Sequence, residues 1–160
     1  MDGPVGDDHS SFSRRLSAHD KAYLETSSRA KKDLVFNWRM WTGLSKEEVG
    51  EVEGRLGHII PQGCLQENLL VSGIPNFTQL LPTTRLVFPE RGGKQTILAV
   101  WEENTPCHTV GERLETHHRI PGLSSRFIAE ARRKRGVMGI VLSAGVIQVG
   151  DEIRVYPPVR

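Results

Sequence analysis

This sequence has few cysteines, a small net charge and no long apolar run. Each of these features excludes a class of protein. The two cysteines, Cys64 and Cys107, could pair in principle. However, residues 1–4 lack the basic and apolar segments of a secretory signal, so we expect reduced thiols in the cytoplasm. The formal charge of +2 is too small to indicate a nucleic-acid partner. No apolar run approaches the roughly 20 residues that span a bilayer, so we expect no membrane association.

What is present is the composition of one ordinary globular domain. The chain has 160 residues, of which 38% are hydrophobic and 25% are charged. A chain of this length and composition can bury a core of its own. Because the sequence contains no internal repeat, no low-complexity tract and no second domain, we treat residues 1–160 as a single domain.

Short strand-like segments separated by turns dominate the chain after residue 59. The strongest is residues 95–103, which are dense in β-branched, aliphatic and aromatic side chains. We expect Pro89 to end a preceding strand that begins at Arg85, with a hairpin turn at residues 91–94. Residues 66–71 predict another strand. After these, the C-terminal segment predicts two or three strands separated by glycine turns.

Helical signals are fewer. They lie at residues 17–32, at 45–56 and at 125–134. In the second segment, Ser45 begins a capping box and the apolar side chains that follow share one helical face. We expect Ser124 to cap the third helix.

Two stretches give weaker signals. Residues 34–41 are apolar and aromatic, and they either continue the first helix or form a separate segment. Residues 108–122 predict irregular structure. Short strands with a few appended helices are typical of a mainly β fold (α+β) with a barrel-like sheet, which is the fold class we expect.

A cysteine follows the strongest predicted strand. Residues 104–107 read Asn-Thr-Pro-Cys, and Pro106 ends the strand because proline donates no sheet hydrogen bond. Cys107 is thus presented by a stiff turn at a strand end, a common position for functional residues. Most free cysteines are small buried hydrophobic residues, and that is our interpretation of Cys64. For Cys107 we favour a functional thiol, which would need nearby positive charge to ionise.

Several basic residues are candidates for that charge. His108 is adjacent, and Arg113, Arg119 or the run at residues 132–135 could approach in space. A solvated helix end explains most of that run, but Arg135 begins a predicted strand and is expected nearer the site. Guanidinium groups can also bind a phosphate bidentately. A zinc site that combines Cys107 with the histidines is disfavoured by their spacing.

Two further places hold candidate ligands. Asp7 and His9 lie close together near the N-terminus, where an acid could orient an imidazole or bind a cation. The alternative for this segment is a solvated terminus. Asn68 either orients a ligand or satisfies the end of a strand.

Four pieces of the chain together resemble the MOSC family, named for the C-terminal domain of molybdenum-cofactor sulfurase. They are residues 6–9 (Gly-Asp-Asp-His), 67–74, 104–107 and 135–151. Each piece alone is weak, but their order over nearly the whole chain is fairly specific. The resemblance implies a MOSC-like β-barrel, in which the motif cysteine is Cys107.

The resemblance also implies a function. Such proteins are associated with the molybdenum cofactor, so Cys107 would hold persulfide sulfur or ligate molybdenum. Asp7, His9, Asn68 and Arg135 would line the cofactor pocket. The protein would be a sulfur carrier or a molybdenum-cofactor-dependent reductase, whose partner is a sulfur donor, a sulfur acceptor or an electron-transfer protein. Pyridoxal phosphate is not expected to bind, because no domain with a Schiff-base lysine is present.

One departure from the family pattern leaves other functions open. Family members have at least one strand before the Gly-Asp-x-His piece, whereas this chain begins almost on it. An uncovered sheet edge would then be a pairing surface. The protein could therefore be a non-catalytic interaction domain derived from the MOSC fold. A simple anion-binding module is a third possibility, and it predicts that Cys107→Ser changes nothing.

Overall fold

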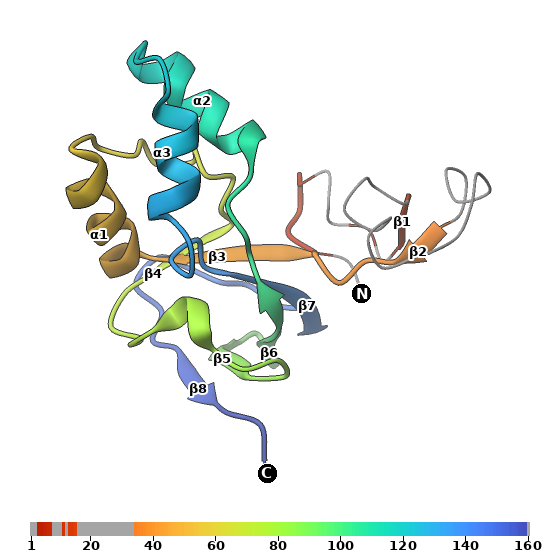
Figure 1. Cartoon of the computed structure of the whole chain (residues 1–160). Helices are drawn as coiled ribbons and strands as arrows, with labels where there is room; N and C mark the ends of the chain where they lie inside the picture. The colour runs from red at the N-terminus through yellow and green to blue at the C-terminus, as the bar shows by residue number, and fades with distance from the viewer. Residues whose placement is uncertain (1–2, 8–10, 12, 16–33, 160) are drawn as a thin grey trace.

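The computed structural model describes residues 3–7, 11, 13–15 and 34–159 (Figure 1). The helix expected over residues 17–32 and the candidate ligand His9 lie outside the described residues. The aromatic stretch that begins at residue 34 forms two separate strands. These are β2 (Leu34–Phe36), which pairs with β1 (Ser13–Arg15), and β3 (Trp41–Ser45).

A six-stranded sheet forms the body of the molecule, and this confirms the mainly β fold. Its strand order is β4-β3-β7-β6-β5-β8, and every pair is antiparallel except β3 with β4. The sheet curls into a half-barrel, and β4 and β8 are its edges among the described residues. The remaining strands are β4 (Leu69–Val71), β5 (Arg85–Arg91), β6 (Lys94–Glu103), β7 (Val137–Ser143) and β8 (Arg154–Tyr156).

Three helices gather on one side of this sheet, away from β8 and the C-terminus (Figure 1). They are α1 (Lys46–Leu56), α2 (His108–His118) and α3 (Leu123–Glu130), and a short 3-10 turn, η2 (Phe77–Gln79), lies between β4 and β5. α1 begins as expected, because the Ser45 hydroxyl accepts from the Glu48 backbone N–H at 3.3 Å.

Two apolar clusters stabilise these layers. One lies among the helices and β3, and the other lines the inner face of the sheet. The helix-side cluster contains Leu44, Val52, Leu56, Ile60, Leu65, Val110, Leu114, Leu123, Phe127 and Ala131. The sheet-side cluster contains Met40, Trp41, Val71, Phe77, Leu86, Phe88, Leu98, Val100 and Val137. Both cysteines pack against the helix-side cluster, so the thiols lie at the border between helices and sheet.

The largest error in the sequence-based prediction is α2, whose residues were expected to be irregular. Its propensity is low because it contains Gly111 and several β-branched residues. Tertiary packing nevertheless stabilises it, since Val110 and Leu114 are buried against the other helices. Gly111 permits the contact, because a Cβ there would lie 2.4 Å from the Ser124 hydroxyl of α3.

The end of β5 and the start of α3 also differ from the sequence-based prediction. Pro89 does not end β5 but lies within it, where the register with β6 shifts between Val87 and Glu90. Proline is tolerated at such irregularities because they leave a backbone position without a ladder hydrogen bond. Ser124 is not the cap, because the N-cap is Gly122, two residues earlier, and α3 begins at Leu123.

Candidate functional site

Cys107 lies where β6 leaves the sheet and α2 begins. The chain is anchored before it, since the backbone N–H of Asn104 donates to the Gly136 carbonyl at 2.9 Å. Cys107 is the N-cap residue of α2, with an extended backbone and no hydrogen bond from its side chain to the helix. Its side chain is half-buried. The thiol therefore stands at the positive end of a helix dipole, where an anion is favoured.

Arg135 is the buried charged group that interacts electrostatically with Cys107. Its side chain is only 4% exposed, and Nη2 donates to the Leu65 carbonyl. Neither Nε nor Nη1 has a partner, although both are buried. Burial lowers the pKa of Arg135 to about 10, and the nearby charges of Cys107 and Glu67 oppose that shift. The guanidinium is therefore protonated at neutral pH and retains unused hydrogen-bond donors.

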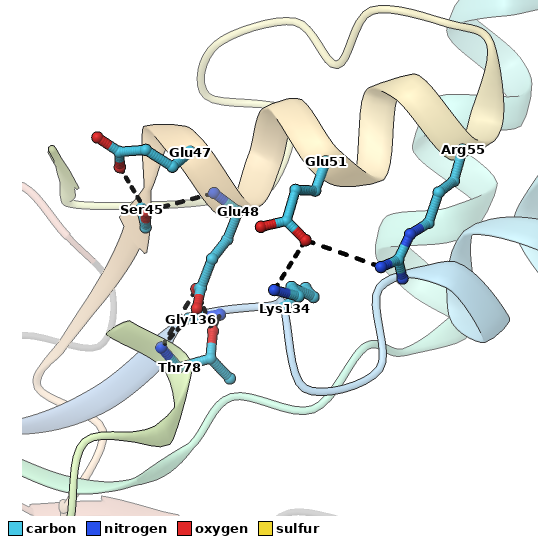
Figure 2. A network of polar contacts seen from close by, with 8 residues as sticks. All are labelled: Ser45, Glu47, Glu48, Glu51, Arg55, Thr78, Lys134 and Gly136. Carbon is cyan, nitrogen blue, oxygen red and sulfur yellow. Dashed lines mark hydrogen bonds and ion pairs between the residues drawn. The ribbon is translucent and has the colours of Figure 1, made fainter. Parts of the chain in front are cut away.

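The turns on both sides of Arg135 hold it in place. Figure 2 shows that Lys134 forms an ion pair with Glu51 of α1 at 2.8 Å. On the other side, the Gly136 backbone N–H donates to the Thr78 hydroxyl at 2.7 Å. A Cβ on Gly136 would lie 1.9 Å from a β3 carbonyl oxygen, and its φ is +78°, so this position requires glycine.

Thr78 is itself fixed by a buried acid. Its hydroxyl donates to Glu48 Oε2 at 2.6 Å, and its backbone N–H lies 3.2 Å from both carboxyl oxygens (Figure 2). Glu48 is 3% exposed, so it does not close the capping box that its spacing from Ser45 suggests. It links α1 and η2 to the start of β7, next to Arg135.

The loop at residues 61–68 brings the second cysteine to Arg135. It is closed by hydrogen bonds from Cys64 N to the Pro61 carbonyl at 3.0 Å and from Gly63 N to Glu67 Oε1 at 2.6 Å. Burial raises the pKa of Cys64, and Glu67 adds to this, while Arg113 and Arg135 oppose it. The other oxygen of Glu67 is buried without a partner. Cys64 is thus a neighbour of the site, although the sequence indicated only a core residue.

Two more arginines make the site cationic. Arg113 lies on α2, and in the amide orientation that satisfies both side chains, Gln66 accepts from its two terminal nitrogens at 3.1 and 3.2 Å. The positive charge of Arg39 acts on Arg135. The charges of Arg113 and Arg135 thus act on Cys64, and Arg39 adds positive charge near Arg135, so this region favours an anionic ligand.

Asn68 and Asp7 form a structural link at the edge of this region. The Asn68 amide donates to Asp7 Oδ2 at 2.6 Å, and its oxygen accepts from the Thr42 backbone N–H at 2.7 Å. Asn68 therefore satisfies the end of a strand and holds Asp7 against β3.

Among the histidines in the described residues, His108 is adjacent to Cys107 and exposed. His117 and His118 are at the opposite end of α2, where His118 Nε2 lies 2.8 Å from the Ile59 carbonyl oxygen. Within residues 3–7, 11, 13–15 and 34–159, no three His, Cys, Asp or Glu side chains are placed to hold a metal ion. Arg133 is exposed and contacts Gln79 at 3.4 Å, so it is not a site residue.

A hollow elsewhere on the molecule is separate from this site. It has a volume of about 350 Å³ and lies on the outer face of β5, β6 and β7, where Trp101 and Leu142 contribute to its lining. None of its lining residues belongs to the group around Cys107. In the described part of the chain, no helix is long and apolar enough to cross a membrane.

The sheet is curled, and a thiol at the end of one strand lies near a buried arginine. These features define a small β domain with a thiol site. The MOSC domain matches residues 39–154, and the chain belongs to this family. The sequence is 32% identical over 157 residues to a Bacillus subtilis (strain 168) protein named "Putative metal-sulfur cluster biosynthesis proteins YuaD". The match covers 96% of this chain and 76% of that relative.

Solved structures agree with this assignment. The crystal structure of the YuaD protein from Bacillus subtilis matches with a TM-score of 0.86 and 31% identity. The match covers 98% of this chain and 82% of the YuaD chain. YiiM from Geobacillus stearothermophilus has a TM-score of 0.55 at 21% identity, with coverage of 74% and 54% respectively. The YiiM similarity concerns the fold alone. The expected MOSC-like fold is thus confirmed.

Proposed function

We propose that the protein is a sulfur carrier in the assembly of the molybdenum cofactor or of a metal–sulfur centre. Cys107 holds the transferable sulfur as a persulfide. The observation that carries this proposal is the buried guanidinium of Arg135, which has two unpartnered nitrogens and interacts electrostatically with Cys107. A persulfide is an anion at neutral pH, and a buried cation beside it favours its formation.

The name of the Bacillus relative supports the general area of this function, because it refers to metal–sulfur cluster biosynthesis. The chain contains free thiols at Cys64 and Cys107, and the proposal requires a reducing compartment such as the cytoplasm. Its partner is a sulfur donor or acceptor. We do not expect pyridoxal phosphate to bind this chain.

A second candidate is ligation of molybdenum by Cys107, in a reductase that uses the molybdenum–pterin cofactor. The donor set fits such a group. A thiolate is a soft metal ligand, and the unpartnered donors of Arg135 suit a phosphate oxygen. When bound, the cofactor would supply the electron transfer. Cys107 would hold it, and the cations Arg39, Arg113 and Arg135 would bind and orient its anionic parts.

Purification from a host that makes molybdenum cofactor separates these candidates. Wild type, Cys107→Ser and Cys64→Ser would be compared for molybdenum, pterin and protein-bound sulfane sulfur. We expect sulfane sulfur in wild type and in Cys64→Ser, and its loss in Cys107→Ser. Near-stoichiometric molybdenum that is lost only with Cys107 would instead favour the reductase.

A non-catalytic interaction domain is the remaining alternative. The edge strands β4 and β8 are the surfaces through which it would pair with another chain. It would carry neither sulfane sulfur nor molybdenum in any of the three proteins, and it would associate in a concentration-dependent way. That combination of results would contradict both site-based candidates.

A further inference from the structure

We propose that Arg135 and the first turn of α2 bind a small thiosulfonate-type anion, from which Cys107 takes its sulfur directly. This inference rests on the sulfur-carrier function proposed above, and it adds the chemical class of the donor. The donor has a sulfane sulfur bonded to an oxidised, negatively charged sulfur, as in thiosulfate.

The case for an anion begins with the buried donors. Arg135 is 4% exposed, and its Nε and Nη1 groups have no acceptor. A buried donor without an acceptor is costly, so such groups in a folded protein indicate a missing ligand or water. The oxygens of a sulfonate group are suitable acceptors for a guanidinium.

The helix end supplies an independent second contribution. α2 has 11 residues, and its N-cap is Cys107, whose side chain makes no capping hydrogen bond. The first backbone N–H groups of a helix lack intrahelical partners and attract anions. An anion held here is adjacent to the Cys107 sulfur.

Burial also limits the size of the donor. The guanidinium lies behind the loop at residues 61–68, to which it is joined through the Leu65 carbonyl. A persulfide on the surface of another folded protein could reach the half-exposed Cys107, but it would leave the buried nitrogens of Arg135 unpaired. We therefore infer a small oxoanion, because only a compact group could pair with these enclosed nitrogens and also lie beside Cys107.

The transfer is balanced without any added oxidant. The Cys107 thiolate attacks the sulfane sulfur of thiosulfate, and a new S–S bond forms on the protein. The S–S bond of thiosulfate breaks, and sulfite leaves with the bonding electron pair. Because an anion attacks a dianion, the reaction is opposed by charge repulsion, and the cluster of Arg135, Arg113 and Arg39 offsets that repulsion.

A single-turnover experiment tests this donor. Reduced full-length protein is mixed with thiosulfate, and released sulfite and the persulfide on each cysteine are quantified over time. We expect one sulfite and one Cys107 persulfide per chain, with none in Cys107→Ser. Arg135→Lys keeps the charge but loses the fork of donors, so the second-order rate should fall about 10- to 100-fold.

The controls separate a binding defect from a folding defect. Arg132→Gln removes an exposed arginine three residues away and should leave the rate unchanged. In wild type, inorganic sulfate has no sulfane sulfur and should slow the reaction competitively. This second measurement decides the question even if the Arg135 variant does not fold.

The same experiment is repeated with a cysteine desulfurase and cysteine as the sulfur source. If the desulfurase loads Cys107 but thiosulfate releases no sulfite, the thiosulfonate inference is overturned and the sulfur-carrier function stands. If neither source loads Cys107, the sulfur-carrier function itself is wrong. An equal rate for wild type and a folded Arg135→Lys protein would also overturn the role given to Arg135.

Discussion

At the scale of single residues, the site is defined by one buried cation that interacts electrostatically with two thiols. Arg135 uses one nitrogen to anchor the loop at residues 61–68, and its other two nitrogens have no partner. Because it is nearly inaccessible, its charge is screened less by solvent than that of an exposed arginine. The two cysteines differ accordingly, since Cys107 stands at a helix N-terminus whereas Cys64 lies in a tight turn.

The charge of Arg135 should be visible in the choice of alkylating reagent at Cys107. Iodoacetate is an anion and iodoacetamide is neutral, so their rate ratio reports attraction of anions separately from the reactivity of the thiol. We expect Arg135→Gln to lower the iodoacetate-to-iodoacetamide ratio about tenfold, because electrostatic steering changes rates by such factors. The measurement is mass spectrometry of the Cys107 peptide. Arg132→Gln is the matched control, and an unchanged ratio in Arg135→Gln would contradict the anion site.

Cys64 should behave as a buried thiol. Its pKa is raised by burial, so the reactive thiolate is scarce at neutral pH. We expect its alkylation in the Cys107→Ser protein to be slow at pH 7 and to rise about tenfold per pH unit up to at least pH 9. A rate that levels off near neutral pH would show instead that Cys64 is an ionised, reactive cysteine.

At the scale of secondary-structure elements, the network of Glu48, Thr78 and Gly136 connects α1, η2 and β7 (Figure 2). It lies beside the site and fixes the backbone that carries Arg135. All of its groups are buried, so each depends on the others for its hydrogen bonds.

Thr78→Val tests this network, because valine keeps the shape of threonine but has no hydroxyl. The Gly136 N–H then loses its acceptor and the Glu48 carboxyl loses a donor. We expect a loss of about 1–3 kcal/mol in the free energy of unfolding, measured by urea denaturation. Thr78→Ser retains the hydroxyl and should cost less. A Thr78→Val protein as stable as wild type would show that the network contributes nothing to stability.

A second element, the turn before β8, should make stability depend on pH. The Gln148 backbone N–H donates to Asp151 at 2.8 Å and Arg91 forms an ion pair with it, so the pKa of Asp151 is lowered. A lowered folded-state pKa stabilises the protein above the unfolded value of about 3.9, and this contribution is lost as the pH falls through the folded value. Asp151→Asn should therefore lower the melting temperature at pH 7, and the difference should shrink in acid. A difference that is the same at both pH values would exclude this account.

At the scale of the whole molecule, the sequence predicted the mainly β fold because the strands carry strong local signals. The strand at 95–103 and the cap at Ser45 are local patterns, and both are present. α2 was missed because its stability comes from packing on α3 through Gly111. Helix propensities of single residues do not reveal such a tertiary contact.

The candidate site was predicted in part for the same reason. Cys107 was singled out because it follows a strong predicted strand, and Arg135 because it begins the strand that resembles the MOSC family. The approach of Cys64 and Glu67 was missed, since it depends on the hydrogen bond from Arg135 to Leu65, a contact between residues 70 positions apart. No local pattern in the sequence specifies that contact.

The most direct test of the central claim is a site-resolved count of persulfide sulfur. Wild type, Cys64→Ser and Cys107→Ser are loaded either with thiosulfate or with a cysteine desulfurase and cysteine, trapped with an alkylating reagent and mapped by peptide mass spectrometry. The account predicts close to one persulfide per chain on Cys107 in wild type and in Cys64→Ser, and none in Cys107→Ser. Persulfide that is absent, or that remains on Cys64 after Cys107 is replaced, would contradict it.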